Sequence, residues 1–117
     1  MVGFHLRKNQ RFNEVMPVRY RREGTACEGL LNELALSGCS ITGTVPVSVG
    51  MVLRVQLRVP GDPEPFLIER AMVKWGKRLE FGVEFEQLPA MAHARLQHLI
   101  FTLARDQRDM RAFAYQR

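Results

Sequence analysis

The sequence predicts a mainly all-β domain, built as a six-stranded antiparallel β-barrel with one C-terminal α-helix. Three observations support this prediction. Apolar and polar residues alternate in several short segments, as they do in strands that bury one face. Turn-forming residues separate these segments, and the last apolar stripe has helical spacing. The chain has 117 residues, of which 46% are hydrophobic and 25% charged, and this composition fits a single globular domain.

The expected strands follow one another from the alternating segment 18–21 to Phe85. The later strands are expected at 25–34, 39–44, 51–59, 66–75 and 79–85. The alternation is clearest in 51–59, where Leu53, Val55 and Leu57 share one face. Residues 60–65 contain three prolines and cannot continue a sheet, whereas Gly76-Lys77-Arg78 fits a tight hairpin.

A helix is expected to begin at Pro89, because proline is favoured at the first helical position. Its apolar stripe consists of Ala92, Leu96, Leu99, Ile100 and Leu103. The predicted core consists of Leu53, Val55, Leu57, Val73, Phe81, Val83 and Phe85, capped by Leu96, Leu99 and Leu103. We expect three parts, namely a flexible basic N-terminal arm over 1–14, the barrel with its helix over 15–105, and a polar C-terminal tail over 106–117.

Positive charge is concentrated near the start of the sequence. Residues 1–22 carry six Lys or Arg and one acidic residue, whereas the other 95 residues carry eleven of each sign. The formal net charge of +5 therefore comes from an N-terminal patch, which suits an anionic partner. A solvated segment that keeps the protein soluble is the alternative interpretation.

The sequence shows no signature of an enzyme or a metal site. It contains no G-x-S-x-G, H-E-x-x-H or Walker motif, and His93 and His98 would lie about 140° apart around a helix. Cys27 and Cys39 are expected to pack as small buried residues in a reducing compartment. No segment resembles a signal peptide or a membrane span, so we expect a cytoplasmic location. We expect no catalysis, no metal and no cofactor.

Arg7-Lys8-Asn9-Gln10-Arg11 places two arginines four residues apart, and a second, incomplete motif ends at Gly38. Together with the segments 50–53, 73–75 and 81–85, these motifs resemble the PilZ domain family, the bacterial second-messenger receptors for cyclic di-GMP. The resemblance extends from Arg7 to about Leu103. It implies a six-stranded antiparallel barrel with a C-terminal helix. It also implies that a cyclic di-GMP monomer or intercalated dimer is held between the arginine arm and the barrel surface.

The second motif of that family reads Asp or Asn, any residue, Ser, two residues and Gly. Here Glu33 stands at the Asp/Asn position, Ala35 at the Ser position and Gly38 at the Gly position. Glu33 keeps oxygen acceptors for a guanine edge, whereas Ala35 has no hydroxyl. Asn32 comes one residue earlier, and strict strand alternation would place it on the opposite face.

By this resemblance, the ligand-binding residues are Arg7, Lys8, Arg11, Glu33, Ala35, Gly38 and Trp75. A guanidinium matches a phosphate or the O6/N7 edge of guanine, and Trp75 offers a stacking face. The leading hypothesis is a single-domain cyclic di-GMP-binding signalling protein that acts through an unidentified effector protein. The alternative is a degenerate PilZ adaptor that does not bind the nucleotide and works by protein–protein interaction. A nucleic-acid-binding barrel is the third hypothesis, which an aromatic content of 9% disfavours.

Overall fold

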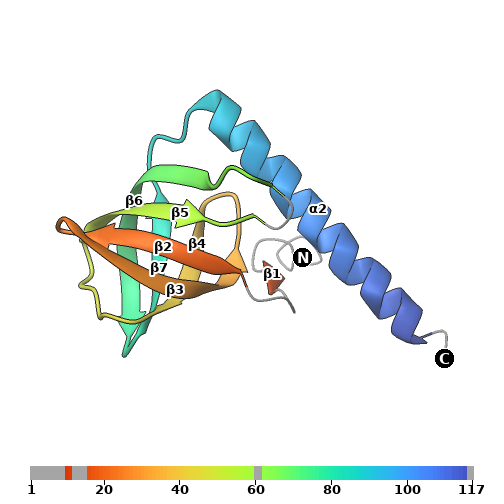
Figure 1. Ribbon diagram of the computed structural model, residues 1–117, viewed down its shortest axis with the longest axis horizontal. Helices are drawn as coiled ribbons and strands as arrows, with labels where there is room; N and C mark the ends of the chain where they lie inside the picture. The colour runs from red at the N-terminus through yellow and green to blue at the C-terminus, as the bar shows by residue number, and fades with distance from the viewer. Residues whose placement is uncertain (1–9, 12–15, 60–61, 116–117) are drawn as a thin grey trace.

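The computed structural model describes residues 10–11, 16–59 and 62–115, and it describes side chains over 16–59 and 62–103. Within these ranges the structure consists of short strands and one long helix (Figure 1). The elements are β1 (Gln10–Arg11), β2 (Pro17–Arg22), β3 (Thr25–Leu34), β4 (Gly38–Gly43), β5 (Val52–Leu57), β6 (Phe66–Lys77), β7 (Glu80–Phe85) and α2 (Ala90–Tyr115).

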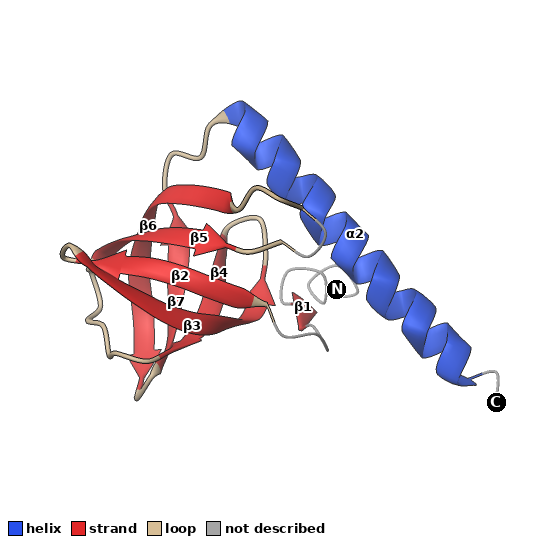
Figure 2. Ribbon diagram, viewed as in Figure 1, coloured by secondary structure: helices blue, strands red, loops and turns tan. Residues whose placement is uncertain are grey.

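The strands from β2 to β7 form a closed antiparallel barrel (Figure 2). They pair in the order β3-β2-β5-β6-β7-β4, and a further pairing between β4 and β3 closes the sheet. β1 adds to β3 beyond the end of β2, with Gln10 opposite Leu34 and Arg11 opposite Glu33. The barrel and its C-terminal helix confirm the predicted fold class.

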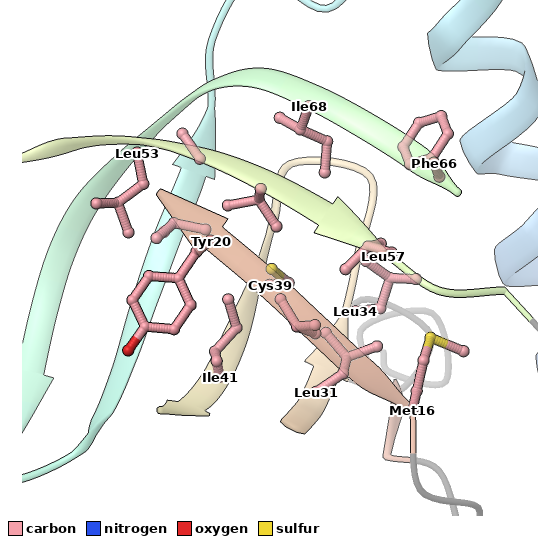
Figure 3. Close-up of a cluster of buried hydrophobic side chains, with 14 of the residues drawn as sticks. Met16, Tyr20, Leu31, Leu34, Cys39, Ile41, Leu53, Leu57, Phe66 and Ile68 are labelled. Atoms are coloured by element: carbon pink, nitrogen blue, oxygen red, sulfur yellow. The ribbon is translucent and has the colours of Figure 1, made fainter. Parts of the chain in front are cut away.

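Apolar side chains fill the interior of the barrel (Figure 3). Every predicted core residue is buried except Phe85 and Leu103, which are partly buried and pack against the same cluster. The core also contains Met16, Val18, Tyr20, Cys27, Leu31, Leu34, Cys39, Ile41, Phe66, Ile68 and Ala71. Burial of one large apolar side chain contributes roughly 1.5–3 kcal/mol, so this cluster is the main source of stability.

A bulge in β3 changes which of its residues face outward. The register shifts between Leu31 and Glu33, so Asn32 is an extra residue in the strand. Leu31 and Leu34 are both buried although they are three residues apart. Asn32 and Glu33 therefore both lie on the outer side, where Asn32 Nδ2 donates to Thr42 Oγ1 at 2.8 Å. The expectation that Asn32 faces away from Glu33 is wrong, because the bulge interrupts the alternation.

The hairpin between β6 and β7 turns at Arg78 and Leu79, whereas the sequence predicted a turn over Gly76-Lys77-Arg78. β6 continues to Lys77, and β7 begins at Glu80. Arg78 has a φ of 60°, a left-handed conformation that helps a two-residue turn reverse the chain. Leu79 is consequently 40% exposed and does not continue the apolar face of β7.

Helix α2 lies across one end of the barrel (Figure 1). Leu96 on its inner face is completely buried. Arg95 donates to Asp62 Oδ2 at 2.9 Å and to the Glu64 carbonyl at 3.2 Å, and its guanidinium lies 5.3 Å from the centre of the Phe66 ring. Hydrogen bonds from the Glu64 N–H and from Arg95 lower the pKa of Asp62. These contacts join the helix to the segment between β5 and β6.

The boundaries of α2 differ from those that the sequence predicted. The helix begins at Ala90, and Pro89 directly precedes it, with the Pro89 carbonyl accepting a hydrogen bond from the His93 N–H at 2.8 Å. It ends at Tyr115, so helical structure continues into the range 106–117 that was expected to be a tail. The division into arm, barrel and tail stays a prediction. In the part of the chain that the structure describes, no helix is both long and apolar enough to cross a membrane.

Candidate functional site

A surface pocket of about 290 Å³ lies where the β3–β4 hairpin meets β6 and β7. Residues 33–35 and 37–40 of the hairpin region line it, together with 74–75 of β6 and 82–84 of β7. Glu33, Ala35, Gly38 and Trp75 are four of the predicted ligand-binding residues, and all of them are in this lining. The barrel therefore brings the second motif and a distant tryptophan to one site.

Gly38 allows the two strands that border the pocket to approach each other. It pairs with Glu84 of β7, and a Cβ at position 38 would overlap the carbonyl oxygen of Val83. The hairpin is also held closed by the Ala35 N–H, which donates to the Gly38 carbonyl at 2.8 Å. Because glycine alone has no Cβ, the motif residue that this sequence retains has a structural role in shaping the pocket.

Trp75 forms a wall of the pocket. The β6–β7 register shifts between Val73 and Trp75, so Lys74 and Trp75 are both exposed on the outer side of the barrel. The indole lies against Gly82, where a Cβ would collide with the ring. The side chain remains 44% exposed. This arrangement presents an aromatic surface beside the pocket, and such surfaces stack readily on nucleobases.

Charged groups of both signs line the pocket. Lys74 Nζ lies 3.5 Å from Glu84 Oε1, and both side chains are about half exposed. An exposed pair of this kind contributes only about 0–1 kcal/mol, so a ligand can replace it at low cost. Glu33 adds a second carboxylate to the lining. The carboxylates of Glu33 and Glu84 can thus accept hydrogen bonds from a ligand, and the ammonium group of Lys74 can bind an anionic group.

The backbone of β1 brings Arg11, the last residue of the first motif, to the second motif. Arg11 pairs with Glu33 across the β1–β3 ladder. The backbone position of this arginine is therefore next to the pocket, although it is far from Glu33 in sequence. Arg7 and Lys8 lie outside the described residues, as does the side chain of Arg11.

Sequence reasoning missed four polar residues of the lining, namely Ser37, Ser40, Lys74 and Glu84. The alternation from Gly38 did contain a signal for Ser40, because residues two apart share one face of a strand. Cys39, which lies between Gly38 and Ser40, is buried in the core, and this burial raises the pKa of its thiol to about 12. Cys39 is therefore a neutral thiol at ordinary pH and not a nucleophile.

Comparisons with known proteins agree with this architecture. The PilZ domain of YcgR from Escherichia coli, solved with cyclic di-GMP, aligns with a TM-score of 0.72 at 14% identity, covering 89% of this chain and 92% of that one. YcgR from Escherichia coli in complex with cyclic di-GMP aligns with a TM-score of 0.74 at 15% identity, covering 91% of this chain and 48% of that one. The PilZ domain of CeSA from a cellulose-synthesizing bacterium aligns with a TM-score of 0.65 at 13% identity, covering 81% of this chain and 98% of that one.

At these levels of identity, the solved structures establish the fold alone. No curated protein matches the sequence. The family model for the PilZ domain matches residues 5–102, which include all seven of the described strands and the first half of α2. This chain belongs to the PilZ domain family.

Proposed function

We propose that this chain is a receptor domain that binds cyclic di-GMP at the pocket between the β3–β4 hairpin and Trp75. The observation that carries the proposal is the convergence of Glu33, Gly38 and Trp75 on one pocket, with the backbone of Arg11 paired to Glu33. Two of the similar solved structures, both of YcgR, contain cyclic di-GMP, which supports the choice of ligand.

Each group in the proposed site has a chemistry that suits part of this ligand. The guanidinium groups of Arg7 and Arg11 would hold phosphate or a guanine edge, and Lys8 would add positive charge. The carboxylate of Glu33 accepts hydrogen bonds and suits the N–H groups of guanine. Trp75 would stack on a base.

The size of the pocket suggests how much of the ligand it holds. Its volume of about 290 Å³ is close to the lower limit of roughly 300 Å³ for small-molecule sites. We therefore place one guanine and its adjoining phosphate in the pocket, with the N-terminal arginines completing the site. We further propose that binding is transmitted by contact with an effector protein, in the cytoplasm.

Isothermal titration calorimetry with cyclic di-GMP tests this proposal. Arg11→Ala is expected to weaken binding by about ten- to a hundredfold, because a hydrogen bond to a charged group contributes roughly 1.5–3 kcal/mol and 1.4 kcal/mol corresponds to one decade. Arg58→Ala is the matched control, since it removes an exposed arginine that does not line this pocket. We expect its affinity to stay within about twofold of the unmodified chain, because surface changes away from a site have small effects.

A second titration, with the adenine analogue cyclic di-AMP, tests recognition of the base. Weaker binding of cyclic di-AMP is expected, because adenine does not present the N–H pattern that suits Glu33. If the unmodified chain gives no heat and no chemical-shift change with excess cyclic di-GMP, the receptor proposal fails. The adaptor hypothesis would then remain.

A further inference from the structure

The pocket contains a serine whose hydroxyl is buried without a partner. Ser40 is 6% exposed and lines the pocket, and its Oγ makes no hydrogen bond within the described part of the chain. Folded proteins satisfy the great majority of buried polar groups, because an unpaired hydroxyl lowers stability. A ligand that supplies the missing hydrogen bond would explain why a serine occupies this position.

The strand register places Ser40 in the middle of the candidate site. Ser40 pairs with Glu33 of β3 on one side and with Gly82 of β7 on the other. Glu33 lines the pocket, and the indole of Trp75 lies against Gly82. Gly38, two residues earlier in β4, is on the same outer face and also lines the pocket. Ser40 therefore faces away from the barrel core, and its burial comes from groups that surround the pocket.

We propose that Ser40 forms a hydrogen bond with bound cyclic di-GMP and so provides the hydroxyl contact that Ala35 lacks. This assignment rests on the proposed binding of the nucleotide at this pocket. A serine hydroxyl both donates and accepts, so it matches either a guanine edge or a phosphodiester oxygen. The ligand reaches Ser40 Oγ when the indole of Trp75 moves from its position over Gly82 to stack on the base. Trp75 is 44% exposed, so part of its surface meets solvent.

The test compares Ser40→Ala with Ser48→Ala in the full chain. Ser48 is exposed and does not line the pocket, so its variant loses a hydroxyl without touching the site. Affinity for cyclic di-GMP is measured by calorimetry, and thermal stability without ligand by circular dichroism. We expect Ser40→Ala to weaken binding by roughly tenfold, the effect of one lost hydrogen bond. Its melting temperature should stay equal or rise, because alanine removes an unsatisfied polar atom and leaves no large cavity.

The outcomes separate this inference from the function on which it rests. If the unmodified chain and Ser48→Ala bind the nucleotide and Ser40→Ala binds it equally well, Ser40 makes no contact and the receptor function stands. A weaker affinity together with a lower melting temperature would show that Ser40 acts through the fold, and this also overturns the assignment. An unmodified chain that does not bind cyclic di-GMP overturns both proposals.

Discussion

The close approach of β4 to β7 at Gly38 can be tested by adding a single methyl group. In Gly38→Ala the new Cβ would overlap the Val83 carbonyl oxygen, and it would lie 3.1 Å from the Val83 carbonyl carbon and 3.2 Å from Glu84 Cα. All three are backbone atoms, so no side chain can rotate to make room. The two strands have to separate around the Gly38–Glu84 pair.

Two contributions set the size of the effect. Forcing an extra methyl group into a packed site costs about 1–3 kcal/mol. Each ladder hydrogen bond that breaks as the strands separate adds about 0.5–1.5 kcal/mol. We therefore expect Gly38→Ala to lower the free energy of unfolding by about 2–4 kcal/mol, a large share of the roughly 5–15 kcal/mol that is typical of a domain.

Gly76→Ala is the matched control in another strand. A Cβ at Gly76 would meet its nearest atom, the Val47 carbonyl oxygen, at 3.8 Å, which is ordinary contact. Alanine in a strand is about 0.5–1 kcal/mol more favourable than glycine, so the control should be neutral or slightly stabilised. Equilibrium urea unfolding followed by circular dichroism measures both variants. The close approach at Gly38 does not limit this position if the free energy of unfolding of Gly38→Ala stays within about 0.5 kcal/mol of the unmodified chain, or if that of Gly76→Ala falls by as much as that of Gly38→Ala.

Three further predictions concern the site and the core. Ala35→Ser is expected to strengthen cyclic di-GMP binding by up to about tenfold through an added hydrogen bond, and calorimetry showing equal or weaker affinity would contradict this. Tyr20→Phe should lower the free energy of unfolding by about 1–3 kcal/mol, because it removes two hydrogen bonds. The Tyr20 hydroxyl donates to the Val45 carbonyl at 3.0 Å and accepts from the Val45 N–H at 3.4 Å. An unchanged midpoint of urea unfolding would count against this prediction. Burial raises the pKa of Cys39 from 9.0 to about 12, so protonation of this thiol stabilises the fold below pH 9.0, and the stabilisation is lost as pH rises toward 12. Between these pH values, the free energy of unfolding should fall more steeply in the unmodified chain than in Cys39→Ala. Parallel pH profiles of the two proteins would show that the thiol of Cys39 does not contribute in this way.

Most strands could be predicted because their side chains alternate around a closed core, as Leu53, Val55 and Leu57 do in β5. The bulges could not, because an extra residue such as Asn32 in β3 is set by the pairing of neighbouring strands. The residue type of Asn32 does not by itself indicate a bulge. For this reason the pattern predicted the wrong face for Asn32.

The candidate site was predictable where a motif or a rare residue marked it, as with Glu33, Gly38 and Trp75. Ser40 was missed because its burial depends on other strands, such as β7, where Gly82 pairs with it and is distant in sequence. The roles of Arg7 and Lys8 stay predictions, since both residues lie outside the described part of the chain.

Trp75 is the one tryptophan in the sequence, and it lies at the wall of the pocket. Its emission under tryptophan-selective excitation therefore reports the polarity and hydration of this site, with no label attached. A change in tryptophan emission with an unchanged far-ultraviolet circular dichroism spectrum would locate an event at the pocket while the barrel stays intact.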